Sequence, residues 1–154
     1  NIFLPVIPNS VYGPNDNFDP MKGHVLSSLI SKFYFAKQNK QDNVTLWGSG
    51  NPKREFLYVD DLVDACIFLL KLKIDITFPL NIGYGSDITI KEIADLISNK
   101  LKYQGVISWD VSKPDGAYQK LLCSSKINGL GWHPKTNLDT GIDNTISWFI
   151  KNKV

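Results

Sequence analysis

The segment WGSGNPKREFLYVDD, residues 47–61, places an aromatic ring, a glycine turn and a guanidinium ahead of an apolar strand. Gly48 and Gly50 allow a sharp bend after Trp47, which predicts an exposed indole. An indole beside a guanidinium offers a surface for a planar base or a sugar face. Arg54 presents a fork of N–H donors that matches a phosphate bidentately. A nucleotide site is one interpretation. The alternative is a hairpin tip with a core tryptophan and solvated cations.

A second residue suited to chemistry is His24, which follows Gly23 where helical spacing begins. From the start of a helix its ring could project into a cleft, and imidazole exchanges protons readily near neutral pH. The alternative is a capping or surface histidine. Lys32 follows two turns later on the same predicted helix, so both side chains could face one cleft. His133, in GWHPK, has no comparable context and is predicted at the surface.

The elements that must position these residues alternate between strand and helix. Strands are predicted over residues 2–7, 44–47, 55–59, 78–82 and 106–109. Helices are predicted to begin at His24, at Asp60 or Asp61, at Thr89 with capping-box spacing to Glu92, at Ser124 and at Leu138. Residues 11–23 are predicted to form a long loop, of a length that is often functional in a compact domain. The alternation indicates an α/β fold.

The helix that follows residue 60, predicted to end near Lys73, starts with two adjacent carboxylates, Asp60 and Asp61. Their place predicts helix caps and connectors rather than catalytic acids. The apolar residues predicted to face inward are Leu62, Ala65, Cys66, Leu69 and Leu70. The thiol of Cys66 is then a small buried side chain.

The composition is that of an ordinary globular protein, with 43% hydrophobic residues, 21% charged residues and a net charge of +2. Lys and Arg are spread along the chain, which argues against a nucleic-acid partner. The apolar stretches, such as residues 65–70, are too short to cross a bilayer, so no membrane partner is expected. Cys66 and Cys123 show neither metal-ligand nor disulfide-framework spacing, so no metal and a cytoplasmic location are expected.

The first residues, NIFLPVIPNS, have the pattern of a buried strand that runs into a turn. A buried strand needs neighbours on both sides, and nothing upstream supplies them. Met21 is the single methionine, and no basic start or cleavage site indicates a signal peptide. The expectation is a fragment whose first half is missing, and with its first strand unpartnered it should be only marginally stable alone.

Three segments, in order, resemble the extended short-chain dehydrogenases: PNSVYGPNDNF at residues 8–18, WGSGNPKREFLYVDD, and SKPDGAYQKLL at residues 112–122. The combination of GPNDNF, Gly23 with His24, and KPDG is similar to the members that epimerise GDP-4-keto-6-deoxy-mannose at carbons 3 and 5 and then reduce carbon 4. The resemblance covers essentially the whole chain. It implies the C-terminal half of such a protein, with the last Rossmann strands and a small α/β substrate-binding domain.

The resemblance also implies NADP(H) as the cofactor. Family members bind it on an N-terminal Rossmann domain, and a loop at a strand end closes over the nicotinamide side. The matching cofactor-binding positions are Pro8, Asn9, Ser10, Val11 and His24. Ser10 stands where the family usually has Asn, and a hydroxyl can donate and accept in place of the amide.

Further roles carried by the resemblance concern the sugar nucleotide. His24 matches the acid that reprotonates carbon during epimerisation. The predicted substrate-binding residues are Lys32, Trp47, Arg54, Asp115 and Lys120. The Asp115 carboxylate could accept from guanine or ribose, although a Pro-Asp-Gly turn needs no ligand to explain it. Family members are usually homodimers, so a GDP-sugar and a second copy are the expected partners.

The catalytic Tyr-x-x-x-Lys pair of the family is absent from these residues. None of the six tyrosines has a lysine four positions on, and no Gly-rich dinucleotide fingerprint is present. The 154 residues alone are therefore not expected to reduce a substrate. Two alternatives remain: another nucleotide-sugar epimerase or dehydratase, distinguished by base preference, and a non-catalytic nucleotide-sugar binding remnant, distinguished by the lack of an upstream Tyr-x-x-x-Lys.

Overall fold

The computed structural model describes residues 3–72 and 78–152. Its strands are β1 (Val6–Pro8), β2 (Ser10–Tyr12), β3 (Asn43–Trp47), β4 (Lys53–Tyr58), β5 (Leu80–Ile82), β6 (Asp87–Thr89), β7 (Val106–Asp110) and β8 (Gln119–Lys120). Its helices are α1 (Val25–Gln38), α2 (Val59–Lys71), α3 (Ile90–Leu101), α4 (Ser125–Gly129) and α5 (Leu138–Asn152). Strands and helices mix along the chain, so the predicted α/β class is confirmed.

Short pairings, most of them parallel, hold the strands together. β1 pairs with β5, β2 with β4, and β3 with β7, each in the parallel sense. β4 also pairs with β6 in the antiparallel sense and with β8 in the parallel sense. β4 therefore touches more strands than any other element in the described part of the chain, and both of its ends are tied to distant segments.

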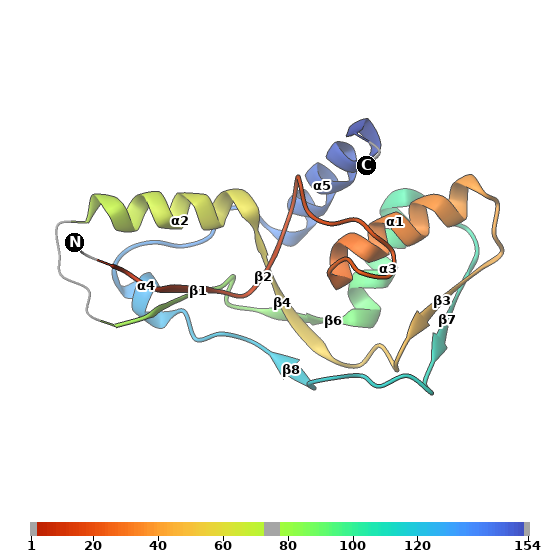
Figure 1. Cartoon of the computed structure of the whole chain (residues 1–154), viewed down its shortest axis with the longest axis horizontal. Helices are drawn as coiled ribbons and strands as arrows, with labels where there is room; N and C mark the ends of the chain where they lie inside the picture. Colours follow the sequence, from red (N-terminus) through yellow and green to blue (C-terminus); the bar gives the residue numbers. More distant parts are fainter. Residues whose placement is uncertain (1–2, 73–77, 153–154) are drawn as a thin grey trace.

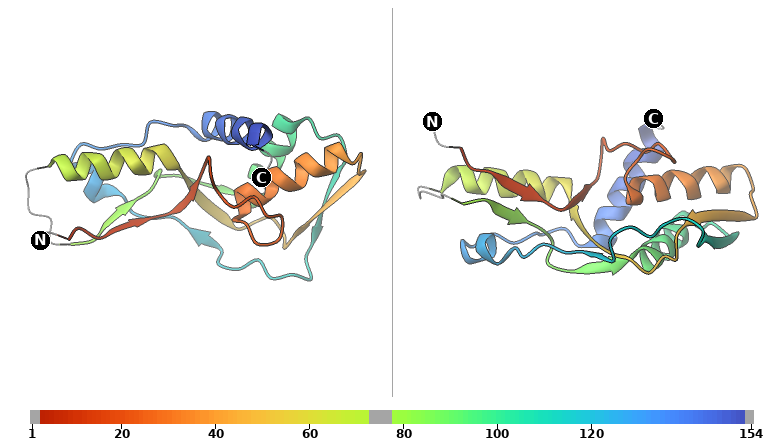
Figure 2. Two further views of the ribbon diagram at one scale, coloured as in Figure 1. Left: turned by 45° about the horizontal axis from the view of Figure 1, so that its top comes forward. Right: turned by 60° about the horizontal axis from the view of Figure 1, so that its bottom comes forward.

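The molecule is elongated, with two lobes that meet along β2 and β4 (Figures 1 and 2). In the smaller lobe, α2 and α4 pack against the β1–β5 pair, and the buried residues are Leu57, Ala65, Leu69, Leu80, Ile82, Ile127 and Trp132. In the larger lobe, α1, α3 and α5 pack together beside the β3–β7 pair. Among the described residues, no helix is long and apolar enough to span a bilayer.

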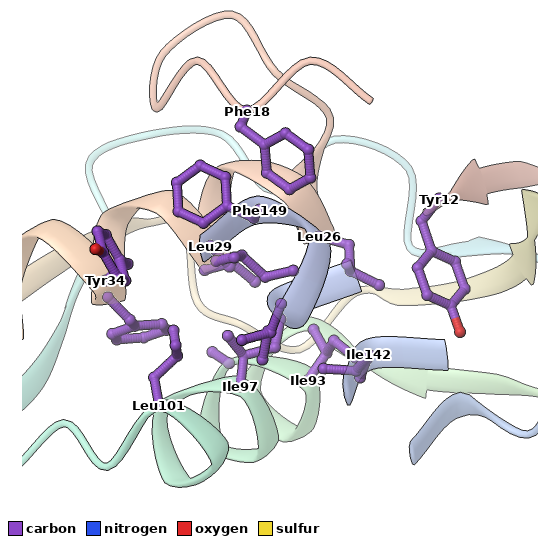
Figure 3. Packing of buried hydrophobic residues seen from close by; sticks show 14 of the residues in the cluster. Tyr12, Phe18, Leu26, Leu29, Tyr34, Ile93, Ile97, Leu101, Ile142 and Phe149 are labelled. Atoms are coloured by element: carbon purple, nitrogen blue, oxygen red, sulfur yellow. The ribbon is translucent and has the colours of Figure 1, made fainter. Parts of the chain in front are cut away.

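The core of the larger lobe anchors the loop that precedes α1. Figure 3 shows Leu26 and Leu29 of α1 above Ile93 and Ile97 of α3, with Phe149 of α5 beside them. Phe18, from the loop, lies over this cluster with its ring centroid 4.7 Å from that of Phe149. Such an aromatic pair contributes about 0.5–1.5 kcal/mol beyond its buried area. The loop that ends at the start of α1 is thus held by the core.

Local signals predicted the helices well. The apolar residues with helical spacing in α1 are Val25, Leu26, Leu29, Ile30 and Phe33, and all are buried except the half-buried Val25. The capping box of α3 is present, since the Thr89 side chain accepts from the Glu92 backbone N–H at 3.1 Å and the Glu92 carboxylate accepts from the Thr89 backbone N–H. An N-cap of this kind typically contributes about 1 kcal/mol to the stability of the protein.

The helix α2 departs from prediction at its N-terminal end. Its N-cap is Tyr58, and neither Asp60 nor Asp61 caps it. Asp61 is instead 4% exposed and accepts from the backbone N–H groups of Lys135 and Thr136 at 3.2 and 2.9 Å. It is a connector to the segment before α5. The predicted caps were wrong because the helix already begins at Val59, and the Asp61 carboxylate accepts from distant backbone N–H groups instead.

Three of the residues predicted to face inward on α2 also differ. Leu70 is 85% exposed, and Leu62 and Cys66 are only partly buried. Ala65 and Leu69 are buried as predicted. The apolar stripe of α2 is therefore narrower than the sequence pattern indicates, because only one face of the helix meets the β1–β5 pair.

The strand predictions were right in place but not in extent. β2 occupies the first residues of the predicted 11–23 loop, and β6 and β8 were not predicted at all. β5 begins at Leu80, so Phe78 and Pro79 precede the strand. The predicted element ends at Ile2 and Lys73 lie outside the described residues.

The glycine turn after Trp47 is confirmed. Gly48 and Gly50 have φ of 82° and 78°, and the Trp47 residue is 58% exposed. These backbone angles favour glycine, because a Cβ would be strained there. The turn brings the chain from β3 into β4 and leaves the indole at the surface.

Gly50→Ala is expected to destabilise the protein by about 1–3 kcal/mol. A Cβ at this position would add φ strain and would lie 2.8 Å from the nearest atom of the Trp109 ring. Urea unfolding of the two proteins measures the difference. Gly129→Ala in α4 is the matched control, because a Cβ there meets nothing within 4 Å, and its midpoint should not fall. Equal midpoints for Gly50→Ala and wild type would contradict the strain argument.

Candidate active site

Two adjoining cavities lie on either side of the start of α1. The histidine cavity, about 560 Å³, is lined by Pro8, Asn9, Ser10, Val11, Tyr12, His24, Val25, Leu26, Arg54, Phe56 and Lys120. The tryptophan cavity, about 290 Å³, is lined by Pro20, Met21, Gly23, Val25, Ser28, Leu29, Lys32, Leu46, Trp47, Ile90 and Trp109. Val25 lines both, so the two cavities meet at the first turn of the helix.

The structure brings together most of the residues that the sequence singled out. The whole segment from Pro8 to Val11 shares the histidine cavity with His24, Arg54 and Lys120. Lys32 and Trp47 lie in the neighbouring cavity. His24 and Lys32 therefore do not share one cavity, although they share one helix. Trp47 and Arg54 are likewise separated, because the turn between them sends the indole and the guanidinium to different cavities.

His24 occupies the N-cap position of α1, and its side chain makes no capping hydrogen bond. The ring is 82% exposed, and Nδ1 lies 3.6 Å from Oδ1 of Asp16. The other oxygen of Asp16 accepts from the Ser27 hydroxyl. Asp16 is thus held by α1 and places a carboxylate beside the imidazole, an arrangement that orients a proton-transfer residue. The sequence analysis missed Asp16, which is the Asp of the GPNDNF segment.

Two cations line the histidine cavity from neighbouring strands. Arg54 of β4 and Lys120 of β8 are direct partners in the parallel register. Arg54 Nη1 donates to the backbone carbonyls of Lys53 and Ala117 at 2.7 and 2.8 Å. These bonds fix the guanidinium in one orientation. Two positive charges in one cavity, that of Arg54 held in place, favour an anionic ligand such as a phosphate group.

Two tryptophans are among the residues that line the tryptophan cavity. Trp47 ends β3, and Trp109 lies near the end of the paired strand β7. The ammonium of Lys113 lies 5.8 Å from the centroid of the Trp47 ring, within the range of a cation–π contact. Two indoles at a cavity of this size suit a flat ring system better than a sugar alone. The sequence analysis did not include Trp109 in the site.

Asp115 lines neither cavity and instead ties two loops together. Its carboxylate accepts from the Ser49 backbone N–H at 2.6 Å and from the Ser49 hydroxyl at 2.7 Å. These two bonds, the backbone one first, lower the pKa of Asp115. A Cβ at Gly48 would lie 2.3 Å from Asp115 Oδ1. The carboxylate thus holds the KPDG segment against the glycine turn that carries Trp47.

Lys32 is the titratable residue of the tryptophan cavity. It is partly buried, and desolvation lowers its pKa from the ordinary 10.5. Burial therefore disfavours the ammonium form in the folded state. At pH values below the pKa of Lys32 in the folded protein, Lys32 is protonated in both the folded and the unfolded state. The desolvation cost of its ammonium group is then fully present. Between the folded pKa and 10.5 the unfolded state binds more proton, so the wild type gains stability as pH rises.

Lys32→Met is accordingly expected to raise the free energy of unfolding at neutral pH, by under about 1 kcal/mol. The gain over wild type should shrink as pH rises through the folded pKa of Lys32. Urea midpoints for both proteins across that range measure the difference. A gain that does not change with pH would show that packing of the methionine, rather than removal of a desolvated charge, is responsible.

Glu55 is the residue that sequence reasoning most clearly missed. Its side chain is 0% exposed within β4 and accepts hydrogen bonds from Asn9, Gly85 and Leu122. The available signal was a carboxylate at the head of the apolar strand EFLYV. A charged residue that is buried in such a strand must have hydrogen-bond partners, which marks it as structurally important.

His133, by contrast, is exposed as predicted. No group of three or more metal-capable side chains occurs among residues 3–72 and 78–152.

The fold and the paired cavities define a class of protein: the chain belongs to the NAD dependent epimerase/dehydratase family, which residues 3–83, just over half of the chain, match. Within that family its similarity is to the GDP-L-fucose synthases. It is 47% identical to GDP-L-fucose synthase 1 of Arabidopsis thaliana, over 95% of this chain and 45% of that protein. It is 39% identical to GDP-L-fucose synthase of Escherichia coli, over 96% of this chain and 49% of that protein.

Solved structures agree with this similarity. A GDP-L-fucose synthetase from Naegleria fowleri bound to NADP superposes with a TM-score of 0.91 at 31% identity, over 98% of this chain and 47% of that one. The predicted resemblance and the C-terminal extended short-chain dehydrogenase fold are thus confirmed at the level of family and fold. The chain spans about half the length of the curated relatives it matches.

Proposed function

We propose that this chain is the C-terminal, substrate-binding half of an NADPH-dependent GDP-L-fucose synthase. The complete protein would convert GDP-4-keto-6-deoxy-mannose to GDP-L-fucose by 3,5-epimerisation and 4-reduction. One observation carries the proposal: His24, Arg54, Lys120 and the Pro8–Val11 segment line one cavity, which adjoins a second cavity lined by two tryptophans. A proton donor, a phosphate-binding pair and a base-binding surface are the parts such a reaction needs.

In this proposal the two cavities divide the substrate between them. The guanine base lies between Trp47 and Trp109 with Lys32 nearby, and the diphosphate lies against Arg54 and Lys120. The sugar then reaches His24 in the larger cavity. The shared lining residue Val25 supports this division, because it places the two cavities next to each other.

His24 would act on carbon rather than on oxygen. Epimerisation beside a ketone removes a proton from carbon and returns it to the other face. The imidazolium of His24 donates that returning proton, and the Asp16 carboxylate 3.6 Å away holds the ring in position. The high exposure of the ring leaves it open to a substrate that enters the cavity.

The Pro8–Val11 segment suits the nicotinamide end of NADPH, which supplies the hydride for reduction when bound. The segment lies at the end of β1 and the start of β2, where ligands of parallel α/β sheets bind. The sequence holds no Tyr-x-x-x-Lys pair and no dinucleotide fingerprint. We therefore assign the rest of the cofactor site and the reduction chemistry to an N-terminal Rossmann half. The complete protein is proposed to be a homodimer in the cytoplasm.

The experiment that tests this function begins with peptide mapping of the native polypeptide by mass spectrometry. Upstream peptides with a Gly-rich fingerprint and Tyr-x-x-x-Lys are expected. The full-length protein should then oxidise NADPH with GDP-4-keto-6-deoxy-mannose and yield GDP-L-fucose. A preference for a UDP or dTDP sugar would instead indicate another epimerase or dehydratase. A native chain without the upstream pair would leave only a nucleotide-sugar binding role.

A further inference from the structure

The carboxylate of Glu55 joins three segments that are far apart in sequence. Oε1 accepts from the Gly85 backbone N–H at 2.6 Å, after β5. Oε2 accepts from the Leu122 backbone N–H at 3.0 Å, after β8, and from the Asn9 side-chain amide, between β1 and β2. Each oxygen is therefore used, and the side chain is fully buried.

The space around this carboxylate is tightly closed. A Cβ at Gly83 would lie 2.4 and 2.7 Å from its two oxygens, so only a glycine fits beside it. Two of the three joined segments also form the wall of the histidine cavity. Asn9 lines that cavity, and Lys120, two residues before Leu122, lines it as well. The carboxylate itself is not among the lining residues.

The amide of Asn9 transmits this arrangement to the cavity. Its Nδ2 donates to Glu55, which fixes the orientation of the amide, and its Oδ1 then accepts from the Ser10 backbone N–H at 2.8 Å. The same Nδ2 lies 3.4 Å from the Lys120 carbonyl oxygen. Asn9 therefore links its own segment, Pro8–Val11, to the strand that carries Lys120.

We propose that Glu55 is a positioning residue, which acts through Asn9 to set the cofactor-side wall of the histidine cavity. This inference rests on the proposed function, since it assigns that wall to the nicotinamide end of NADPH. Glu55 does not touch the reacting atoms. Its carboxylate keeps the Asn9 amide and the Lys120 strand at a fixed separation.

Glutamine is the informative replacement at this position. It keeps the shape of the side chain but has one acceptor oxygen where the carboxylate has two. Its NH₂ group must face either the Gly85 N–H or the Asn9 and Leu122 donors, which leaves a buried donor unpaired. If the Asn9 amide flips to accept from the new NH₂, it can no longer accept from Ser10. The wall of the cavity changes when the NH₂ group faces the Asn9 and Leu122 donors, because Asn9 lines the cavity and Gly85 does not.

In the full-length protein, Glu55→Gln is expected to weaken NADPH binding about tenfold, from the loss of one buried hydrogen bond to a charged group. Fluorescence titration with NADPH measures the Kd. Steady-state kinetics should show a rise in KM for NADPH larger than the fall in kcat. Asp61→Asn is the matched control, since Asp61 is also buried and accepts two backbone N–H groups, away from the cavities. It should lower stability without changing the Kd more than twofold.

A double-mutant cycle with Asn9→Ala tests whether Glu55 affects NADPH binding through Asn9. If Glu55 acts through Asn9, Glu55→Gln should change the Kd much less in the Asn9→Ala background. If the glutamine variant does not fold, Glu55→Asp, which keeps the charge one methylene shorter, takes its place in both measurements. An unchanged Kd for NADPH in a folded Glu55 variant, or full additivity in the cycle, overturns the inference.

Hydrogen exchange separates this inference from the proposed function. Exchange of the Ser10 and Leu122 amides should speed up in Glu55→Gln whether or not the protein binds NADPH. A wild-type protein that binds no NADPH would remove the proposed function, and faster exchange would then leave the structural link intact. A wild-type protein that binds NADPH, together with unchanged exchange at both amides, would remove the inference alone.

Discussion

His24→Asn in the full-length protein is expected to slow 3,5-epimerisation by about 10²–10³-fold, the usual contribution of a positioned general acid. Asparagine cannot donate a proton to carbon, whereas the fold should be little affected. His24 makes no capping hydrogen bond, and its ring is 82% exposed. Incorporation of deuterium from D₂O into the keto sugar, followed by mass spectrometry, measures epimerisation directly.

His133→Asn is the matched control, because His133 is exposed and lies outside both cavities. Its deuterium incorporation should equal that of wild type. Thermal unfolding of both variants should match wild type, which separates chemistry from stability. If His24→Asn incorporates deuterium at the wild-type rate, the proton donor is another residue, and the role assigned to His24 is wrong.

Arg54→Ala is expected to weaken binding of GDP about 10- to 100-fold, the range for one lost charge-assisted fork on a phosphate. The guanidinium is held in place by the carbonyl of Ala117 at 2.8 Å, so its orientation is set before a ligand arrives. Isothermal titration of the full-length protein with GDP gives the Kd. Arg54→Lys should bind with intermediate affinity, since it keeps the charge and loses the fork.

Loss of Arg54 also frees the loop that contains Ala117, and a control must separate that effect. Ser49→Ala removes the hydroxyl bond from Ser49 to Asp115, which holds the same loop, and leaves Arg54 in place. It should change the Kd for GDP by less than about threefold. Equal losses in Ser49→Ala and Arg54→Ala would show that loop placement, rather than phosphate contact, accounts for the binding.

Local sequence signals predicted the parts of the fold that local interactions determine. The apolar spacing of α1 and α3 and the Thr89–Glu92 capping box each involve residues within a few positions of one another. β6 and β8 could not be predicted in this way. They are three and two residues long, and they are strands only because β4 pairs with them from far away in the sequence.

The same distinction between local and long-range interactions decides which parts of the candidate site could be predicted. The exposed Trp47 and the glycine turn followed from residue types. Residue types also singled out His24 and Arg54, and the family resemblance added the roles expected of them. The loop before α1 is anchored in the core by Phe18 and lines the tryptophan cavity with Pro20, Met21 and Gly23. No local pattern encodes this packing, nor the placement of His24 and Lys32 in different cavities. The roles of Asp16, Asp61 and Glu55 rest on donors 11 to 75 residues away.

Strand β4 belongs to both lobes at once. Leu57 is buried in the smaller core, and its neighbours Phe56 and Tyr58 are buried in the larger one. Because adjacent side chains of a strand point to opposite faces, neither core can be lost without exposing part of this strand. The two lobes should therefore melt as a single cooperative unit, and the amides of β4 should be among the slowest to exchange. Arg54 lies on the same strand and lines the histidine cavity. Damage to either core is therefore expected to loosen β4 and, with it, the position of Arg54 in that cavity.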